Sequence, residues 1–510
     1  MRKTIDDMQA EINDTAEQRR ILRERGICVV IPTYDNAATV VDVVTRARMQ
    51  CDDVIVVCDG CSDGTERLVQ AVEGITVVAY KENKGKGEAL KQGFCKALEM
   101  GFSYAITIDA DGQHFPEDIH VFLDANIKHP GALIVGARKG LEKAERSKGS
   151  KFANAFGNFW FCVQTGRCLK DTQTGYRLYP LRKIRGLGLL TSRYEAELEL
   201  MVFLCWHGVS IVSAEVDVYY PPKEERVSHF RPGKDFARIF VLNTCLCFLA
   251  LLYGLPLKLF RTLMIFLRTT YSLLFYLLSC FLILIPYTCV VNLLWRDAER
   301  KSSLLHGLLY RMTRFVIRQH GIPGVRYEVH AGGETFEKPA VIICNHQSHL
   351  DLMIMLSQTR KVVMLTNDWV WHSPFFGLVI RNAEYYPVSM GMEAIMPKLK
   401  SLVERGYSIA LYPEGTRSQN CSIGRFHKGA FHIARMLQTD ILPLVEYGVG
   451  RVLPKGGKYL RKGQIVVQMN RRVPFEEYDK IGSDLQLASW FRQYYRREYS
   501  SMCNRYDRDA

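Results

Sequence analysis

The sequence has no regular cysteine spacing, although it contains 15 cysteines in 510 residues. Cys58 and Cys61 have the two-residue separation of a metal or redox pair, but no second pair and no nearby histidine completes a zinc site. We therefore predict no disulfide framework and expect reduced thiols, as in a protein that faces the cytoplasm. Internal repeats and low-complexity tracts are also absent.

The N-terminus lacks the apolar stretch of a secretory signal peptide. Residues 1–26 carry charges throughout, so they predict a solvated helix and no leader segment. We therefore expect the domain that follows to start on the cytoplasmic side of a membrane.

Charge is absent from two long segments in the middle of the chain. Residues 271–295 contain no charged residue over 25 positions, and residues 239–257 are also uncharged, although Asn243 and Pro256 interrupt their apolar pattern. About 20 apolar residues suffice to cross a bilayer as a helix. We therefore predict membrane segments within residues 239–300, either a hairpin of two crossings or one crossing beside a re-entrant helix.

Acidic residues are scarce near these segments, within a chain whose net charge is +14. Residues 255–330 hold ten Lys and Arg against three Asp and Glu. Cations beside a membrane attract anionic lipid headgroups by about 1 kcal/mol each. Since no nucleic-acid recognition motif accompanies the charge, we expect a membrane and no nucleic acid as the partner. Basic residues flank the second segment on both sides, so the positive-inside rule gives no clean topology.

Short apolar runs alternate with helical patterns in the first half of the chain. The apolar runs are residues 27–35, 54–57 and 105–108, and the helical patterns are residues 38–48 and 88–100. This alternation predicts an α/β domain with a parallel sheet, which binds ligands at the carboxyl ends of its strands. Polar clusters beginning at Asp35, Asp59 and Asp109 follow the three runs.

Two carboxylates follow the third apolar run. Asp109 and Asp111 are two residues apart, so one can bind a divalent ion directly and the other can bind the ion or a coordinated water. Such an ion acts as a Lewis acid that neutralises the diphosphate leaving a nucleotide sugar. Taken singly, Asp-Ala-Asp is more often an ordinary turn, because Asp is common in loops.

Four blocks occur in order in this region: VVIPTYDNAATV, VVCDGCSDGT, NKGKGEALKQGF and DADGQHFPED. On these blocks, residues 27–240 resemble family 2 glycosyltransferases, in particular the branch of dolichyl-phosphate mannose synthases. The resemblance implies a GT-A fold with a Rossmann-like parallel sheet, a nucleotide-sugar donor and Mg²⁺ or Mn²⁺. It implies nucleotide-sugar binding by Asp35, Asp59, Asp63 and Lys86, and metal binding by Asp109, Asp111 and Gln113. Cys58 stands where the family commonly has an acidic residue, which leaves uracil or guanine recognition open.

The later block DTQTGYR, Asp171–Arg177, matches the family block that faces the acceptor. Asp171 is the candidate catalytic base, which a hydroxyl acceptor needs and an anionic phosphate acceptor does not. A structural capping role is the alternative, and Glu195 and Glu197 are weaker candidates. A basic segment resembles the one that closes over the diphosphate, with a solvated patch as the alternative; its candidate residues are Arg226, His229 and Arg231.

The second half of the chain contains a histidine and an aspartate five residues apart. An apolar strand at residues 339–344 leads directly to His346, and Asp351 follows. In acyl transfer to an alcohol, the histidine removes the hydroxyl proton, and the carboxylate fixes its tautomer and stabilises the imidazolium. Five residues turn an ideal helix by about 500°, so the two side chains meet only if His346 lies in the turn before the helix.

This pair belongs to a set of motifs. The set consists of Asn-His-x4-Asp, YPEGTRS at residues 412–418, SPFFG at residues 373–377 and ILP at residues 441–443. On this set, residues 310–475 resemble lysophosphatidate-type acyltransferases, which implies an α/β glycerolipid acyltransferase domain with an acyl-CoA or acyl-ACP donor. It implies acceptor binding by Glu414, Gly415, Thr416 and Arg417, the last as a bidentate fork. The family's middle motif often has an arginine where this chain has NAEYYP at residues 382–387, so either the acceptor is not lysophosphatidate or Arg381 substitutes.

Together these features predict a bifunctional transferase of glycolipid biosynthesis at the cytoplasmic membrane, with both catalytic domains facing the cytoplasm. The expected partners are a nucleotide sugar, an acyl thioester, a lipid acceptor and the membrane. Three alternatives remain: a polyprenyl-phosphate sugar synthase joined to an independent lysophospholipid acyltransferase, glycosylation and acylation of a polyene or aromatic acyl chain, and a lipid-binding scaffold with one inactive site. The expected divisions are a charged helix (1–26), a glycosyltransferase domain (27–238), membrane segments (239–300), an acyltransferase domain (301–480) and a basic tail (481–510).

Overall fold

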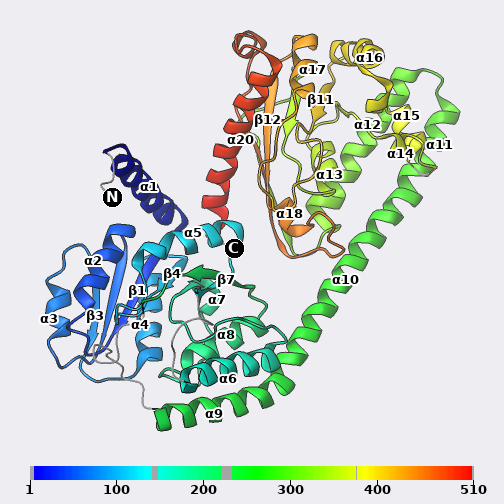
Figure 1. Ribbon diagram of the computed structural model, residues 1–510. Coiled ribbons are helices and arrows are strands. Elements are labelled where there is room, and N and C mark those ends of the chain that lie inside the picture. Colours follow the sequence, from blue (N-terminus) through cyan, green and yellow to red (C-terminus); the bar gives the residue numbers. More distant parts are fainter. Residues whose placement is uncertain (1–4, 140–147, 220–231, 375, 508–510) are drawn as a thin grey trace. The chain divides into compact units, whose positions relative to one another are not determined.

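The computed structural model describes residues 5–139, 148–219, 232–374 and 376–507. The chain divides into two compact units (Figure 1). The first unit comprises Met1–Arg261 together with Asn504–Ala510, and the second comprises Thr262–Cys503. Each unit is built around its own β-sheet flanked by helices, which confirms the α/β class for both halves.

The first unit contains a seven-stranded sheet. Its strands are β1 (Ile27–Thr33), β2 (Val54–Asp59), β3 (Thr76–Tyr80), β4 (Tyr104–Thr107), β5 (Leu133–Arg138), β6 (Arg177–Pro180) and β7 (Ile211–Val216). They are ordered β3-β2-β1-β4-β6-β5-β7, and every neighbouring pair is parallel except those of β6, which runs antiparallel to β4 and β5. The carboxyl ends of β1, β2 and β4 therefore meet at one edge of the sheet.

Helices cover both faces of this sheet. One face is covered by α1 (Ile5–Arg25), α2 (Val40–Gln50), α3 (Thr65–Gln70) and α5 (Ile119–Lys128), and the other by α4 (Lys86–Glu99), α6 (Lys148–Thr165), α7 (Leu181–Ile184), α8 (Ala196–Trp206) and α9 (Pro232–Leu249). Alternate residues of β1 enter opposite cores: Val29 and Ile31 face one, and Cys28 and Val30 face the other. Burial on both faces explains why the strands read as continuous apolar runs.

The end of the chain is part of the first unit. Arg25, which is 3% exposed, donates hydrogen bonds to Asn504 Oδ1 (3.3 Å) and Asp507 Oδ2 (3.2 Å). The Tyr104 hydroxyl donates to the carbonyl oxygen of Asp507 (3.2 Å), and Asn504 donates to Glu24 (2.7 Å). Because Arg25 and Asp507 are both buried, this pairing neutralises two charges inside the unit.

The second unit contains a six-stranded sheet. Its strands are β8 (Val325–His330), β9 (Val341–Cys344), β10 (Val362–Met364), β11 (Ser408–Leu411), β12 (Ile441–Tyr447) and β13 (Gly463–Met469). They are ordered β10-β11-β9-β12-β13-β8, and only β12 and β13 pair antiparallel among the described strands. The helices of this unit include α12 (Ala298–Arg314), α13 (Leu350–Leu356), α14 (Asp368–Trp371), α15 (Gly377–Asn382), α16 (Met392–Glu404), α17 (Gly429–Leu437), α18 (Val449–Val452) and α19 (Phe475–Tyr478).

A long C-terminal helix packs on the sheet of the second unit. Helix α20 (Asp484–Tyr506) occupies most of the expected basic tail. The ring of Phe491 stacks on Phe431 with their centroids 5.2 Å apart, and the Tyr495 hydroxyl accepts a hydrogen bond from Leu444 N (3.1 Å). Aromatic side chains on one side of this helix therefore complete the core around β12.

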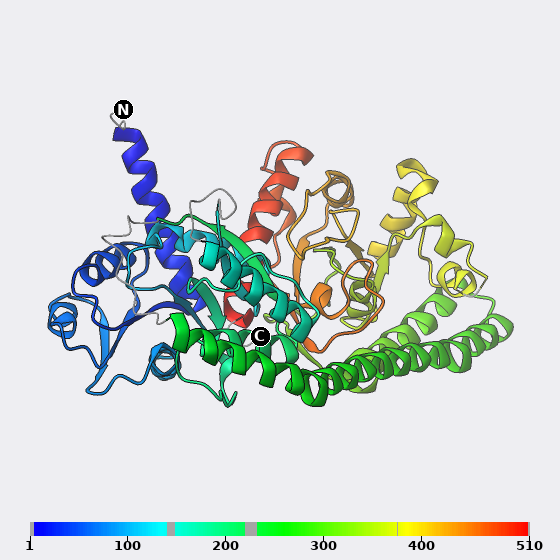
Figure 2. The ribbon, with the colours of Figure 1, turned by 60° about the horizontal axis from the view of Figure 1, so that its bottom comes forward.

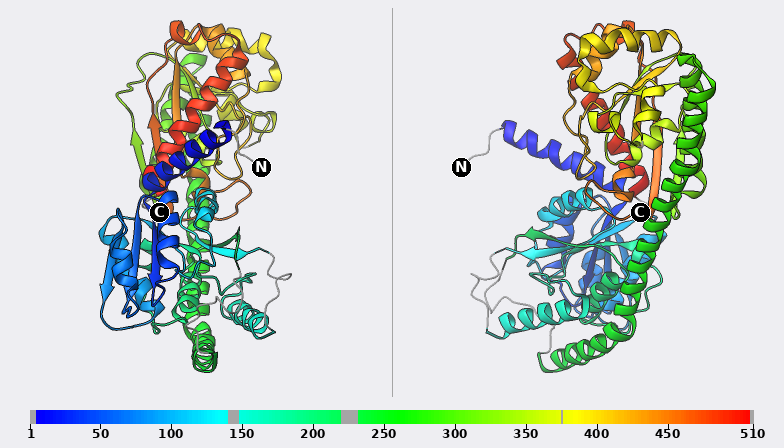
Figure 3. Two further views of the ribbon diagram at one scale, coloured as in Figure 1. Left: turned by 60° about the vertical axis from the view of Figure 1, so that its left-hand side comes forward. Right: turned by 90° about the vertical axis from the view of Figure 1, so that its right-hand side faces the viewer.

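One continuous apolar helix occupies the region where the sequence predicted either a hairpin of two crossings or one crossing beside a re-entrant helix. It comprises α9, a π-helical turn (Ala250–Gly254), α10 (Leu255–Ser279), a second π-helical turn (Cys280–Leu284) and α11 (Ile285–Leu294). Figures 2 and 3 show its ribbon without a reversal of direction. Residues Ala237–Leu294, 58 in number, form the one candidate membrane helix among the described residues. This is far more than the roughly 20 residues that one crossing needs.

Two prolines, including the one that interrupts the first uncharged run, are accommodated within the helix. Pro256 and Pro286 each lie two residues after one of the π-helical turns. A proline lacks the N–H that an α-helix requires and collides with the carbonyl four residues earlier. The wider π turn before each proline gives this carbonyl room, so the chain continues in one direction.

Within each unit, one side of this long helix is buried and the other exposes apolar side chains. The buried residues include Leu242, Leu246, Gly254, Ser279, Leu284 and Val291. The exposed ones include Phe248, Leu251, Leu252, Leu263, Leu282 and Leu293. A soluble protein rarely exposes so many large apolar side chains along one element, and such a surface indicates a lipid or protein partner.

Candidate active sites

Asp59, at the end of β2, holds the loop that precedes α4. Its carboxylate accepts hydrogen bonds from the backbone N–H groups of Lys84 (2.7 Å) and Gly85 (2.9 Å). The next residue, Gly60, has φ +67°, and a Cβ there would overlap the backbone of Asn83. This close approach and the two hydrogen bonds fix the position of the loop that carries Lys86.

Asp35 and Asp63 fix the two remaining loops at this edge of the sheet. Asp35, itself at φ 47°, accepts a hydrogen bond from Ser62 N (2.7 Å). Asp63 accepts hydrogen bonds from Ala37 N (3.0 Å) and Thr65 N (3.0 Å). The three aspartates that the sequence predicts at the nucleotide site thus link the loops after β1 and β2 to each other and to the start of α4.

Lys86 bridges two carboxylates beside these loops. Its Nζ lies 2.7 Å from Asp109 Oδ1 and 2.8 Å from Glu197 Oε2. Burial opposes the charge of both Lys86 and Asp109, but their mutual attraction outweighs it, so the pKa of Lys86 is raised and that of Asp109 is lowered. The residue that the sequence predicts at the phosphates therefore contacts a predicted metal ligand, and both are charged at neutral pH. The neighbouring His114 is neutral, because burial lowers its pKa to about 4.

Asp109 and Asp111 follow β4 and meet the acceptor block. Gly175 lies so close to the Asp109 carboxylate that any Cβ there would overlap its oxygens. Asp111 Oδ1 accepts a hydrogen bond from the backbone N–H of Gln113 (3.0 Å). The described residues contain no cluster of three or more His, Cys, Asp or Glu suited to a metal. Two hard carboxylates still fit Mg²⁺ or Mn²⁺, which commonly take their other ligands from water and substrate phosphates.

Asp171 forms a buried ion pair. Arg138, the last residue of β5, donates to both of its carboxylate oxygens, at 2.6 Å and 2.9 Å. Gln173 N adds a third hydrogen bond at 3.2 Å. Burial alone would raise the pKa of Asp171, but Arg138 holds it below its ordinary value. A carboxylate bound on both oxygens by a guanidinium is a weak base, so this geometry favours the structural alternative for Asp171.

The other acceptor-side candidates have different outcomes. Glu197 is engaged by Lys86, as described above. Arg226, His229 and Arg231 lie outside the described residues. Arg138 could not be predicted from sequence motifs, because its contact with Asp171 depends on how β5 is placed beside a distant loop.

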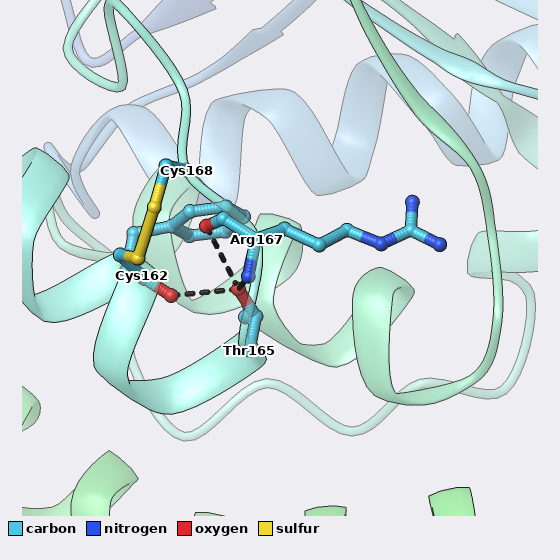
Figure 4. The surroundings of a disulfide bond; sticks show 5 residues. Cys162, Thr165, Arg167 and Cys168 are labelled. Atoms are coloured by element: carbon cyan, nitrogen blue, oxygen red, sulfur yellow. Dashed lines mark hydrogen bonds between the residues drawn. A yellow bond between two sulfur atoms is a disulfide. The ribbon is translucent and has the colours of Figure 1, made fainter.

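A disulfide lies next to the acceptor block. Figure 4 shows Cys162, in α6, bonded to Cys168, in the loop that leads to Asp171. Between them the Thr165 hydroxyl donates to Phe161 O (2.7 Å) and accepts from Arg167 N (3.2 Å). The expectation of reduced thiols is therefore wrong for this pair, while the other 13 cysteines, all within the described residues, form no disulfide. A separation of six residues in an irregular sequence gives no pattern from which this bond could be predicted.

In the second unit, the structure brings His346 and Asp351 together. His346 lies in the turn between β9 and α13, and its Nδ1 is 2.8 Å from Asp351 Oδ2. The same carboxylate oxygen accepts hydrogen bonds from Gln347 N (2.6 Å) and Ser348 N (2.9 Å). Asp351 is fully buried, whereas the His346 side chain is 19% exposed. The imidazole can therefore reach a substrate while its carboxylate partner cannot.

Glu414 joins the YPEGTRS motif to this turn. Its Oε1 accepts a hydrogen bond from His346 N (2.9 Å) and its Oε2 accepts one from Gly424 N (2.9 Å). Burial raises the pKa of Glu414. The ring of Tyr412 lies 4.5 Å from that of His346, centroid to centroid. Glu414 thus positions the backbone of the catalytic turn, a role that differs from direct contact with the acceptor.

Cationic groups gather on the exposed part of this motif. Lys455 donates hydrogen bonds to Thr416 Oγ1 (3.1 Å) and to the carbonyl oxygen of Arg417 (2.9 Å). Burial and then the charges of Arg417 and His346 lower the pKa of His349, which places Arg417 within electrostatic reach of the dyad. Gly415 and Thr416 are exposed. Lys455 extends the acceptor site predicted from the sequence; it lies outside every motif and could not have been identified from them.

Comparison with known proteins identifies a family for each half of the chain. Residues 28–171 match the model of the glycosyl transferase family 2, and residues 325–446 match that of the acyltransferase family. The chain therefore carries a family 2 glycosyltransferase domain and an acyltransferase domain. Both resemblances inferred from the motifs are confirmed, and both domains are transferases.

Individual relatives match one domain each. Over 222 residues, the glycosyltransferase half is 25% identical to UDP-N-acetylglucosamine--dolichyl-phosphate N-acetylglucosaminyltransferase of Methanococcus voltae, covering 39% of this chain and 88% of that protein. Over 150 residues, the acyltransferase half is 29% identical to a chloroplastic 1-acyl-sn-glycerol-3-phosphate acyltransferase of Arabidopsis thaliana, covering 28% of this chain and 42% of that protein. The crystal structure of the acyltransferase PlsC from Thermotoga maritima aligns with 18% identity and a TM-score of 0.39, covering 48% of this chain and 98% of that one.

Proposed function

We propose that this chain is a bifunctional membrane-associated transferase that moves a sugar from a nucleotide sugar and an acyl group from an acyl thioester onto lipids. The observation that carries the proposal is that each unit contains its own constellation. Lys86, Asp109 and Asp111 lie together in the first unit, and His346 pairs with Asp351 in the second.

The sugar acceptor of the first site is proposed to be a lipid phosphate. A hydroxyl acceptor needs a base, whereas a phosphate is already anionic. Asp171, the predicted base, is occupied by Arg138, and Glu197 is occupied by Lys86. The printed name of the Methanococcus voltae relative pairs a UDP-sugar with dolichyl phosphate, which supports this choice. These points favour a polyprenyl phosphate as the sugar acceptor of the first site. A lipid hydroxyl is the second candidate acceptor.

The ion site serves the leaving group. Asp109 and Asp111 would hold Mg²⁺ or Mn²⁺, which when bound neutralises charge on the diphosphate. Lys86 places a second positive charge beside Asp109, and Glu197 stabilises this charge from the other side. Asp59 and Asp63 keep the surrounding loops in place before the donor binds, which reduces the ordering cost of binding.

The second site is proposed to transfer the acyl group directly. His346 accepts the proton of the acceptor hydroxyl as its oxygen attacks the thioester carbonyl, and the C–S bond then breaks. The imidazolium returns this proton to the departing thiolate, so the enzyme ends in its starting state. Asp351 orients the ring and stabilises its charged form. Arg417 and Lys455 supply the positive charge that a phosphate on the acceptor or on the acyl carrier requires.

The long helix is proposed to lie in the membrane interface. Each unit buries one side of it and exposes apolar residues on the other, as an interfacial helix would. The cations Lys258, Arg261 and Arg268 lie on the same helix and can contact anionic headgroups. With 58 residues, the helix is too long to lie fully inside a bilayer as one perpendicular crossing.

The test is reconstitution of the full chain in vesicles that contain either a polyprenyl phosphate or a lipid alcohol. UDP-sugars and GDP-sugars are supplied one at a time, together with labelled acyl-CoA or acyl-ACP, and lipids are followed by mass spectrometry. We expect sugar transfer to the lipid phosphate and acyl transfer to a hydroxylated lipid. Sugar transfer to the alcohol alone would overturn the phosphate assignment, and failure of every acyl thioester would overturn the second activity.

A further inference from the structure

A second buried carboxyl lies behind the His346–Asp351 dyad. Glu446 is the sixth residue of β12, within the otherwise apolar sequence ILPLVEY, and its side chain is fully buried. Neither of its carboxyl oxygens receives a hydrogen bond from an N–H or O–H group of the described residues. The same holds for Asp351 Oδ1 and for the Tyr412 hydroxyl. Four buried polar atoms at a catalytic dyad call for an explanation, because each unpaired one costs free energy.

The two oxygens of Asp351 differ sharply in their surroundings. Oδ2 accepts three hydrogen bonds, from His346, Gln347 and Ser348. Such donors favour the ionised carboxylate, so Asp351 carries the negative charge. Asp351 Oδ1 then requires a hydrogen-bond donor of its own, because the N–H groups of Gln347 and Ser348 already donate to Oδ2.

Glu446 is placed to be this donor. Two carboxyl groups that interact in a buried site cannot both ionise, and one of them keeps a proton. Burial first, and then the charge of Asp351 and a side-chain hydrogen bond with it, raise the pKa of Glu446 well above its ordinary value. Since Asp351 has the stabilising donors, the proton belongs on Glu446.

We propose that Glu446 is a positioning residue for acyl transfer, whose protonated carboxyl donates its O–H to Asp351 Oδ1. The carboxylate that orients His346 is then held on both of its oxygens. The inference rests on the proposed acyl transfer by this dyad, and it adds a third member that acts through Asp351 and does not touch the substrate.

The surroundings of Glu446 support a neutral carboxyl. Asp351, Cys344, Tyr412 and Tyr327 are the titratable groups with which it interacts, from α13, β9, the end of β11 and β8. None of these four groups is a cation, so none of them is a counter-ion for a Glu446 carboxylate.

The backbone of Glu446 is also fixed relative to the motif. Asn345, which precedes His346, donates through its side-chain amide to Glu446 O (2.9 Å) and accepts from Glu446 N (2.8 Å). Asn345 belongs to the Asn-His-x4-Asp motif, so the motif itself places β12 and its carboxyl beside the dyad.

The first test measures the proton directly. Infrared difference spectra of the full-length wild type and Glu446→Gln at pH 7 should show the carbonyl stretch of a buried carboxylic acid, lost in the variant. Tyr412→Phe is the matched control, because it removes the other unpartnered group of the cluster and should leave this band in place. Absence of the acid band in the wild type would show that Glu446 is ionised and would overturn the proposal without bearing on acyl transfer.

The second test separates positioning from packing. Glu446→Gln retains a neutral donor, so kcat should fall by no more than about threefold, and the acidic limb of the kcat/KM profile should stay in place. Glu446→Leu removes the donor, so kcat should fall by about tenfold or more. The uncompensated Asp351 charge then favours the imidazolium, and the acidic limb should move to higher pH.

A purely structural role gives a different pattern. If Glu446→Gln and Glu446→Leu lose activity equally and the acidic limb of the kcat/KM profile stays in place, the proposal is overturned. If Glu446→Leu fails to fold, the infrared band and the pH profile of kcat/KM for Glu446→Gln still test the proposal. Loss of acyl transfer in the wild type itself, by contrast, would indicate that the proposed function is wrong.

Discussion

Asp171 and Asp351 are both buried carboxylates that pair with a nitrogen-containing side chain, but the geometry of each pair favours a different role. Arg138 binds both oxygens of Asp171, so neither oxygen is basic enough to remove a proton from an incoming acceptor. Asp351 uses one oxygen for His346, and the ring of His346 remains partly exposed. One aspartate therefore stabilises a loop, and the other tunes a base.

Replacement of Asp171 should affect stability more than chemistry. Asp171→Asn leaves the buried Arg138 charge without its partner, which costs about 3–5 kcal/mol of folding free energy. The stabilisation from this pair is present when Asp171 is ionised and is lost as pH falls through its lowered pKa. We expect a lower thermal unfolding midpoint, with a near-normal turnover per folded molecule on a lipid phosphate.

The control for Asp171 is the double variant Arg138→Leu/Asp171→Leu, which removes both charges and should recover part of the lost stability. A folded Asp171→Asn enzyme that has lost sugar transfer, measured at a temperature well below its midpoint, would restore Asp171 as the base.

Sugar transfer should depend on a divalent ion at Asp109 and Asp111. Asp111→Asn removes one anionic ligand, so sugar transfer should fall by about a hundredfold or more, while acyl transfer remains near normal. Radiolabelled nucleotide sugar provides the measurement, and His346→Ala serves as the reciprocal control. Undiminished sugar transfer in excess EDTA would contradict the assignment.

Acyl transfer should depend more on His346 than on Asp351. His346→Ala removes the base and should lower the rate by about 10²–10⁴-fold. Asp351→Asn should cost less, because an amide oxygen can still accept from the imidazole and preserve part of its orientation. No acyl-enzyme should accumulate with labelled acyl thioester. Acylation at the parent rate by purified His346→Ala would rule out the dyad.

The helix Ala237–Leu294 could either cross a membrane or lie on its surface, and the two arrangements predict different behaviour. Leu252 on this helix is 78% exposed, and Leu190, in a loop of the same unit, is 67% exposed. If the helix lies in the interface, Leu252→Gln should weaken vesicle binding by about tenfold, because burying one leucine contributes about 1.5–3 kcal/mol. Leu190→Gln is the matched control and should bind as the wild type does.

Vesicle flotation measures this binding, and alkaline carbonate extraction separates the two arrangements. An interfacial helix should be released from membranes by carbonate, whereas a crossing helix should remain. Retention after extraction, with normal binding of Leu252→Gln, would contradict the interfacial arrangement.

The success of sequence-based prediction also differs from element to element. Strand ends carrying Asp59 and Asp109, and the turn carrying His346, follow local rules of apolar runs and turn residues, so they could be predicted. Arg138 and Glu446 could not be assigned, because their roles depend on contacts between strands that are far apart in sequence. An acidic residue in the apolar sequence ILPLVEY was nevertheless a usable signal for Glu446.

The prediction for the helix Ala237–Leu294 failed in a different way. Two uncharged runs, the first interrupted by Pro256, suggested separate membrane segments, since proline usually ends a helix. Whether a π-helical turn absorbs the proline depends on the packing of the helix, which no local pattern in the sequence reports.

At the scale of the whole molecule, the fusion of two transferases in one chain requires a reason. A tether raises the effective concentration of one site for the product of the other. We therefore predict that a lipid product of one site is a substrate of the second. Two separately expressed halves, at equal catalytic content, should form the final lipid more slowly than the intact chain.

Vesicles containing wild type, Asp111→Asn or His346→Ala test this coupling. One variant should accumulate a half-modified lipid that the other completes when the two are mixed, as followed by mass spectrometry. If the variants make unrelated lipids and neither feeds the other, the two activities are independent and the chain is a fusion of convenience.

The pairing of Arg25 with Asp507 has a consequence for synthesis of the protein. The two residues are 482 positions apart, so the second leaves the ribosome long after the first. At about 5–20 residues per second, Arg25 waits roughly 25–100 s for its partner. The first unit therefore completes its fold only after Asp507 has been synthesised, and a chain that stops before this residue lacks the partner of a buried arginine and should be a preferred target for proteases.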